Sequence, residues 1–300
     1  MAKREEILKS VDGYELSLAI YEAKNPKAII QFIHGMEEYK ERYTAFAEYL
    51  SREGYICVTS DLRGHGNSAP LLSHISNKYG DRLLVEDQKV IRDYIENTYT
   101  KLPVYLFGHS MGSIIARVMM QKYGKRYEKV CLSGYVNPNP VAGMGKCLTK
   151  LITVFKGPKG HSKFITGLAV GAFNKTIKNP RTPLDWLSYN EANVDKYIAD
   201  PLCGVEFTLG SYYALMALLA KMGKAKKYHS VNPQTPIMLA GGEDDPCTGF
   251  EKGREASKLL LERAGYRNIT QKTFKHMRHE ILNEKGNSLI YEEIYRFFRK

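Results

Sequence analysis

Short apolar runs alternate with helical patterns along most of the chain. Mostly apolar runs are typical of buried strands, and they occur at 28–33, 55–59, 104–107, 129–132 and 236–240. Residues 269–274 are also interpreted as a strand, before the last helix. Between them, amphipathic patterns predict helices at 43–52, 81–99, 110–123, 250–264 and 288–299. Apolar strands separated by helices predict a mostly parallel central sheet with helices on both faces. The alternating segment 14–21 predicts an antiparallel edge hairpin.

Residues 137–230 interrupt this rhythm. The stretch begins with Asn137-Pro-Asn-Pro140, carries further prolines, and shows no convincing strand pattern. We interpret it as a mostly helical insertion between two strands. The chain then divides into an α/β core, residues 1–136 and 231–300, and a helical cap, residues 137–230.

Composition narrows the class of protein. Of the 300 residues, 43% are hydrophobic and 25% are charged, as in soluble globular proteins. The first residues have no apolar run behind their charges, so we expect no signal peptide, and no apolar stretch approaches the ~20 residues of a membrane span. The five cysteines are scattered without a Cys-x-x-Cys pair, so we expect reduced thiols, a cytoplasmic location and no structural zinc.

The net charge of +12 raises the question of a nucleic-acid partner. No basic run with interleaved aromatic residues and no nucleic-acid-binding motif is present, so we expect no such partner. The charge is concentrated in the insertion, where 13 Lys and Arg residues face 5 Asp and Glu residues.

A Gly-x-Ser-x-Gly motif, Gly108-His-Ser-Met-Gly112, lies between an apolar strand and a helix. This placement is that of a nucleophile elbow, in which a strained turn exposes the serine hydroxyl above the sheet. The helix that follows supplies partial positive charge for an oxyanion. We therefore predict Ser110 as a nucleophile; the alternative is a serine that only caps a helix in a glycine-rich turn.

A serine nucleophile needs a base, and the base needs an acid that orients it. In the α/β-hydrolase fold these follow in the order Ser, Asp or Glu, His, at the ends of strands. The strand at 236–240 is followed by Asp244 and Asp245, and the last strand by His276 and His279. We favour Asp245, which precedes a proline, and His279, because His276 still continues the strand.

The first strand of the parallel set ends in His34-Gly-Met36. A backbone N–H from this loop and the N–H after the serine would form an oxyanion hole, which assigns Met36 and Met111. A tight turn without a catalytic role is the alternative.

Four motifs together resemble the monoglyceride lipase and lysophospholipase branch of the α/β-hydrolases, which is often described as a serine aminopeptidase family. They are His34-Gly-Met36, Asp61-Leu-Arg-Gly-His-Gly-Asn-Ser68, Gly108-His-Ser-Met-Gly112 and Arg278-His-Glu-Ile-Leu-Asn-Glu284. The resemblance implies the α/β-hydrolase fold with a cap, Ser110 as nucleophile, Asp245 as acid, His279 as base, and Met36 and Met111 at the oxyanion hole. It also implies that Asp61 and Arg63 brace a loop near the site. The chain departs from the family pattern after Asp-Pro, where Cys247-Thr-Gly replaces the common Val-Gly.

The insertion contains three apolar segments separated by lysines, at 148–155, 164–173 and 209–219. One interpretation is a lid whose inner face receives an acyl chain and whose cationic outer face contacts anionic lipid. The alternative is ordinary helix packing with solvated lysines. The expected location is therefore the cytoplasm, with peripheral membrane contact under the first interpretation.

The resulting prediction is a serine carboxylic ester hydrolase that acts on lipid-like monoacyl esters, as a monoacylglycerol lipase or a lysophospholipase. We expect a small-molecule acyl ester as substrate and no metal or organic cofactor. A small-ester esterase and an acyl thioesterase are alternatives. An aminopeptidase is less favoured, because the sequence shows no evident acidic patch for an amino terminus. A non-catalytic binding protein on this scaffold would be expected to lack one residue of the triad.

Overall fold

The computed structural model describes residues 3–300, with the side chain of Ser68 also outside the description. The expectation of no signal peptide partly concerns residues 1–2, which lie outside the described residues. Within residues 3–300, eight strands form one sheet in the order β1-β2-β4-β3-β5-β6-β7-β8. The strands are β1 (Lys3–Lys9), β2 (Glu15–Tyr21), β3 (Ala28–Ile33), β4 (Tyr55–Ser60), β5 (Val104–His109), β6 (Lys129–Ser133), β7 (Ile237–Gly242) and β8 (Ile269–Phe274).

Six neighbouring strands, from β4 to β8 in the sheet order, pair in parallel. The N-terminal hairpin of β1 and β2 is antiparallel and joins this set through an antiparallel pairing of β2 with β4. The predicted α/β-hydrolase fold, its parallel sheet and its edge hairpin are thus confirmed. Because the parallel strands share a direction, the loops after their carboxyl ends gather at one edge of the sheet.

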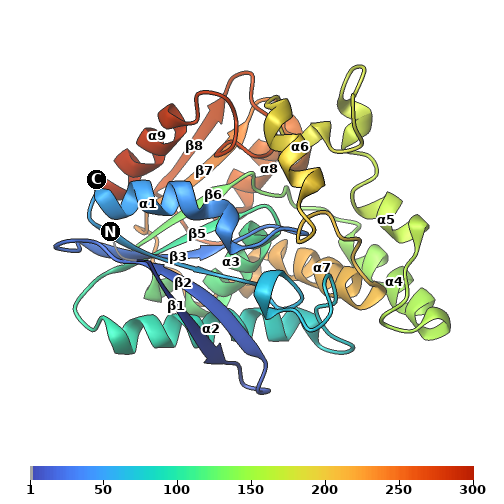
Figure 1. Cartoon of the computed structure of the whole chain (residues 1–300), viewed down its shortest axis with the longest axis horizontal. Helices are drawn as coiled ribbons and strands as arrows, with labels where there is room; N and C mark the ends of the chain where they lie inside the picture. The colour runs from blue at the N-terminus through green and yellow to red at the C-terminus, as the bar shows by residue number, and fades with distance from the viewer. Residues whose placement is uncertain (1–2) are drawn as a thin grey trace.

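Helices cover both faces of the sheet (Figure 1). On one face, α1 (Thr44–Arg52) and α9 (Ser288–Arg299) pack on the strands through residues such as Phe46, Leu50 and Phe298. On the other face lie α2 (Gly80–Thr98), α3 (Met111–Tyr123) and α8 (Phe250–Arg263). Successive residues of β3 alternate between the two cores, because side chains of a strand point to opposite faces. This alternation within a strand that is apolar except for Gln31 explains why the sequence predicted burial on both sides.

Helices α4 (Ala142–Lys156), α5 (Lys163–Ala169), α6 (Glu191–Ala199) and α7 (Leu209–Met222) connect β6 to β7, and this segment contains no strand, as predicted. Helix α7 packs on α2 and α3 of the core, and α4 lies on α7. The side of α4 that packs inward carries small residues, Ala142, Gly145 and Thr149. Helix α4 lies far from the sheet, at the right edge of Figure 1.

Most predicted boundaries hold within two residues, and one shift matters for the site. Strand β5 continues through His109, because Gly108 and His109 still pair with β6. Helix α3 begins only at Met111, not at Ser110. Ser110 is therefore the single residue between strand and helix.

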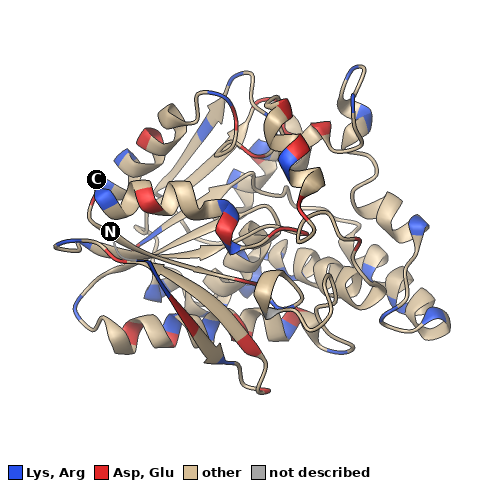
Figure 2. Cartoon of the chain, viewed as in Figure 1, with Lys and Arg blue, Asp and Glu red and all other residues tan. Residues whose placement is uncertain are grey.

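Basic side chains are spread over the surface, and Figure 2 shows lysines without acidic neighbours along α4. Within the described residues, no helix combines the length and apolar character that a bilayer crossing requires.

Candidate active site

Ser110 occupies a strained turn between β5 and α3. Its φ of 52° and ψ of −119° lie outside the regions that most residues adopt. Glycines on either side make the turn possible, because a Cβ on Gly108 would lie 2.6 Å from the Gly112 carbonyl oxygen. A Cβ on Gly112 would lie 2.0 Å from the carbonyl oxygen of Ile33. The sequence motif thus reflects backbone crowding, and strain of this kind is typical of functional turns.

His279 and Asp245 lie together beneath the loops that follow β8 and β7. The Nδ1 of His279 hydrogen-bonds both carboxylate oxygens of Asp245, at 3.0 and 3.1 Å. Asp245 is itself fixed, since its Oδ1 accepts from the backbone N–H of Cys247 at 2.8 Å. Both side chains are buried. Burial opposes the charged imidazole, but the Asp245 carboxylate outweighs it and raises the pKa of His279 well above its ordinary value.

The two residues that the sequence left as alternatives point elsewhere. Asp244 accepts a hydrogen bond from the Tyr189 hydroxyl at 3.1 Å. His276 is exposed, with a φ of 53° in the turn after β8. Of the two aspartates and two histidines, the fold therefore brings Asp245 and His279 into contact.

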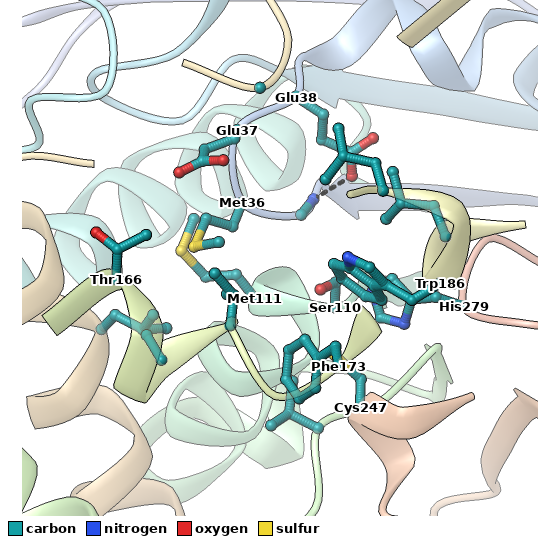
Figure 3. A pocket seen from close by; sticks show the side chains of 18 of the residues that line it. Met36, Glu37, Glu38, Ser110, Met111, Thr166, Phe173, Trp186, Cys247 and His279 are labelled. Carbon is teal, nitrogen blue, oxygen red and sulfur yellow. Dashed lines mark hydrogen bonds between the residues drawn. The ribbon is translucent and has the colours of Figure 1, made fainter. Parts of the chain in front are cut away.

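Ser110 and His279 line the same cavity, which Figure 3 shows from close by. The indole of Trp186, from the insertion, packs on the His279 ring with centroids 5.0 Å apart. The ring of His109 lies 4.8 Å from that of His279 on another side. Burial, with the neighbouring His279, holds the pKa of His109 well below its ordinary value, so His109 stays neutral.

The loop after β3 brings Met36 to the cavity beside Met111. His34 fixes this loop: its Nδ1 donates to the Gly35 carbonyl oxygen at 2.7 Å, and its Nε2 accepts from the backbone N–H of Leu62 at 2.8 Å. A Cβ on Gly35 would lie 3.1 Å from the Cβ of Ser110, so only glycine allows this close approach. Both residues predicted for the oxyanion hole thus flank the serine.

The loop that begins at Asp61 is held by ion pairs in which most of the side chains are buried. Asp61 binds the Lys40 ammonium at 3.1 Å and accepts from the Lys40 backbone N–H at 3.0 Å. Arg63 binds Asp87 through two nitrogens, at 2.8 and 2.9 Å, and Asp12 at 2.8 Å. These contacts agree with the bracing role that the resemblance implied.

Sequence reasoning missed a buried ionic network next to His279. Arg42 binds Glu280, the residue after His279, in a two-pronged contact of 2.7 Å at each nitrogen. Asn193 of α6 donates to the same carboxylate at 2.6 Å. Burial opposes ionisation of Glu280, but the Arg42 guanidinium outweighs it and holds the pKa of Glu280 below its ordinary value. No local pattern marks these residues, because their partners are remote in sequence.

Glu38 extends this network to the loop after β3. Its carboxylate accepts from the Gly35 backbone N–H at 2.6 Å and from the Tyr43 hydroxyl at 2.7 Å, and Arg42 lies 3.5 Å away. The loop of Met36 and the segment of His279 are therefore joined through Arg42.

The cavity has a volume of about 480 Å³. Much of its lining is apolar and comes from α3, the segment after β6 and the insertion, including Ile114, Val136, Ala169, Val170, Phe173, Leu184, Leu187, Leu215 and Leu219. A cavity of this size and character suits a largely apolar small molecule.

Comparisons with known proteins agree with this geometry. The family described as "Serine aminopeptidase, S33" matches residues 24–286. The chain is 27% identical to the monoglyceride lipase of Homo sapiens, with 89% of this chain and 81% of the relative covered, and 24% identical to that of Rattus norvegicus, with 95% and 87% covered. It is 24% identical to the monoacylglycerol lipase of Mycolicibacterium smegmatis, with 90% of this chain and 87% of that relative covered.

Among solved structures, a thermostable carboxyl esterase from Bacillus coagulans in complex with glycerol superposes with a TM-score of 0.90 at 24% identity, covering 100% of this chain and 98% of that one. A lipase in an open form gives a TM-score of 0.88 at 23% identity, covering 99% and 98%. These likenesses show a shared fold. The chain therefore belongs to the serine aminopeptidase S33 family of the α/β-hydrolases, and it is a carboxylic ester hydrolase.

Proposed function

We propose that the protein hydrolyses lipid-like monoacyl esters, as a monoacylglycerol lipase or a lysophospholipase, with Ser110, His279 and Asp245 as a catalytic triad. The observation that carries the proposal is the hydrogen bond of His279 to the buried Asp245 at the edge of a largely apolar cavity that Ser110 also lines. The relatives named monoglyceride lipases support the substrate class.

In the proposed mechanism, His279 accepts the proton of Ser110 as its hydroxyl oxygen attacks the ester carbonyl. Asp245 holds the imidazole in the correct tautomer and stabilises the imidazolium. The backbone N–H groups of Met36 and Met111 donate to the oxyanion, aided by the N-terminus of α3. The alcohol leaves with the proton from His279. Water, activated by the same histidine, then hydrolyses the acyl-enzyme and releases the fatty acid.

An ester series tests this proposal. We expect monoacylglycerols from acetyl to palmitoyl to give a maximum of kcat/KM at long chains, because the apolar cavity rewards buried methylene groups. Ser110→Ala should lower the rate by about 10⁴-fold or more. The matched control is Ser257→Ala, which removes a buried hydroxyl in α8 outside the cavity. Hydrolysis of aminoacyl-amides alone, or full activity of Ser110→Ala, would contradict the proposal. Acyl thioesters are measured in the same series, and a higher kcat/KM on thioesters than on the matching esters would favour the thioesterase alternative.

We also propose that residues 137–230 act as a cap that contacts membranes. Its outermost helices, α4 and α5, turn large apolar side chains to solvent: Met144, Leu151, Val154, Phe155, Phe164 and Leu168 are 52–82% exposed. On α4 the fully buried positions carry small residues, and Leu148 and Ile152 pack partly against the core. Met144, Leu151, Val154 and Phe155 of the same helix are exposed, which is unusual for a helix that only packs on a core.

Charge around this apolar surface favours an anionic bilayer. Lys146, Lys150, Lys156 and Lys163 lie on the same two helices, which carry no acidic residue (Figure 2). Apolar insertion combined with basic residues is the usual basis of interfacial binding. The interpretation differs from our sequence-based one in a single respect: the outer face is apolar as well as cationic.

Co-sedimentation with vesicles tests the contact. We expect binding to vesicles that contain phosphatidylglycerol, weaker binding to pure phosphatidylcholine, and a loss of about tenfold in affinity for the double variant Phe155→Ser, Phe164→Ser. Leu289→Ser is the matched control, because Leu289 is 70% exposed on α9, outside the cap. If the double variant binds vesicles as tightly as Leu289→Ser, α4 and α5 do not form the membrane-binding surface.

A further inference from the structure

The thiol of Cys247 lies against the Asp245–His279 pair and has no role in the proposed mechanism. Cys247 is the residue at which this chain departs from the Asp-Pro-Val-Gly pattern, two positions after Asp245. Its side chain is buried, lines the cavity and interacts with the imidazole of His279. Valine at this position would offer only methyl groups, whereas cysteine adds a sulfur atom beside a carboxylate and an imidazole.

Three kinds of metal ligand therefore meet at this point. The Sγ of Cys247, a carboxylate oxygen of Asp245 and a ring nitrogen of His279 all lie within 4.8 Å of one another. Among residues 3–300, no other group of three or more His, Cys, Asp or Glu residues brings its ligand atoms together in this way. All three side chains are buried, unlike the acidic groups that gather on a surface without an ion. Thiolate, imidazole and carboxylate are the side-chain ligands that bind Zn²⁺ in proteins.

The arrangement needs little movement to hold a zinc ion. Atoms that share a tetrahedral zinc lie about 3.4–3.6 Å apart, because zinc–ligand bonds are about 2.0–2.3 Å long. The Nδ1 of His279 already lies 3.0 and 3.1 Å from the two carboxylate oxygens of Asp245. The Sγ of Cys247 has to approach by about 1 Å, which a modest rotation of its side chain supplies. Cys247 and His279 line the cavity, so an ion can enter from that side and keep one water molecule as its fourth ligand.

We propose that Asp245, Cys247 and His279 form an inhibitory site for Zn²⁺ or a chemically similar divalent ion. The inference rests on the proposed ester hydrolysis, in which the same aspartate and histidine act; the ion is an inhibitor and not a cofactor. On binding, the Cys247 thiol loses its proton to solvent, and the ion forms bonds to Sγ, to Nδ1 and to one carboxylate oxygen, with no transfer of electrons.

Inhibition follows from the tautomer of the imidazole. In the proposed mechanism Nδ1 of His279 carries the proton that bonds Asp245, and Nε2 accepts the proton of Ser110. A neutral imidazole that binds the ion through Nδ1 carries its proton on Nε2 instead. That nitrogen can then no longer accept the serine proton. Since the ion occupies the side of the ring that faces Asp245, we expect it to lower kcat and to leave KM nearly unchanged.

Titration with zinc chloride tests the site. Hydrolysis of p-nitrophenyl butyrate is measured in a buffer without chelators, with a phosphine reductant that keeps the thiols reduced. We expect half-inhibition at micromolar Zn²⁺ and recovery on addition of EDTA. Cys247→Val should raise the Zn²⁺ concentration for half-inhibition by about 100-fold or more, because it removes a ligand outright. Each variant is compared with itself without zinc, so a change in its basal activity cancels.

Cys147→Ser is the matched control, because it removes an exposed thiol of α4 outside the cavity. It should be inhibited by Zn²⁺ like the wild type. Equal inhibition of Cys247→Val and the wild type would overturn the site, as would the absence of inhibition at millimolar Zn²⁺. An increase in KM without a fall in kcat would place the ion elsewhere in the cavity and would overturn the site as well.

Cobalt provides a second measurement that needs neither activity nor a stable Cys247→Val variant. Co²⁺ added to Cys147→Ser should give a near-ultraviolet charge-transfer band, the signature of a thiolate ligand. It should also quench the single tryptophan, Trp186, whose ring lies 5.0 Å from that of His279 and which packs in one cluster with Cys247. Cobalt binding without the charge-transfer band would overturn the site. If the wild type hydrolyses no ester, the proposed function fails, while the cobalt spectrum still decides whether the ion binds.

Discussion

The indole of Trp186 packs against the imidazole of His279, with the ring centroids 5.0 Å apart. Trp186 comes from the insertion and is the single tryptophan of the chain, whereas His279 follows the last strand of the core. The contact therefore joins the insertion to the proposed base and places one fluorophore directly against it.

Tryptophan fluorescence should report the protonation of His279, because a protonated imidazole quenches a neighbouring indole. The Asp245 carboxylate raises the pKa of His279, so emission should fall as the pH drops through a midpoint above the ordinary value of 6.5. Asp245→Asn removes the raising charge and should move the midpoint downwards. His109, the other adjacent histidine, stays neutral in this range and adds no transition. A midpoint that Asp245→Asn does not lower would contradict the assigned cause.

The same protonation should control activity. A protonated His279 cannot accept the serine proton, so kcat/KM for a neutral ester should decline on the acid side with an apparent pKa above 6.5. The measurement is a pH–rate profile of the free enzyme, set beside the fluorescence midpoint. Two clearly different midpoints would argue against His279 as the base.

The two neighbouring aspartates should differ strongly in their effect on turnover. Asp245→Asn should lower kcat by about 10⁴-fold, since an amide favours the wrong imidazole tautomer. Asp244→Asn is the matched control, because that side chain accepts from the Tyr189 hydroxyl at the surface. Steady-state kinetics on one ester suffices. A larger loss in Asp244→Asn than in Asp245→Asn would reverse the assignment.

Replacing glycine by alanine should have opposite effects on stability in the turn of Ser110 and at an open helix position. A Cβ at Gly112 would lie 2.0 Å from the Ile33 carbonyl oxygen, so Gly112→Ala should destabilise the fold by about 3 kcal/mol or more and reduce activity. At Gly143 in α4 no atom lies within 4 Å of the added Cβ, and Gly143→Ala should raise stability by up to about 1 kcal/mol. Thermal unfolding measures both. A Gly112→Ala variant with the wild-type Tm would show that the backbone can shift freely.

Arg42 should be essential for stability although it is not assigned a chemical role. Arg42→Met leaves the buried Glu280 carboxylate without its cation, which should cost about 3–5 kcal/mol in the free energy of unfolding. Arg52→Met, at an exposed position of α1, should change it by less than about 0.5 kcal/mol. Urea denaturation compares the two. Similar midpoints for both variants would mean that water replaces the guanidinium at Glu280.

Local patterns were enough to predict the sheet, its helices and the residues of the elbow. Burial on both faces makes most of the parallel strands largely apolar, and backbone crowding at Ser110 admits only glycine at Gly108 and Gly112. Such constraints act within a few residues, so they are visible in sequence. The order of Asp245 and His279 after their strands follows from the fold, once the fold is recognised.

Relations between remote segments needed the folded chain. The turns after β7 and β8 direct Asp245 towards His279 and Asp244 towards Tyr189, although the two aspartates are adjacent and chemically identical. Arg42 meets Glu280, and Asn193 of the insertion donates to the same carboxylate, only because the loops after the parallel strands and the insertion gather at one edge of the sheet. The sequence pattern does not reveal which charged side chains pair with each other, because their interaction depends on distance in space and not on separation along the chain.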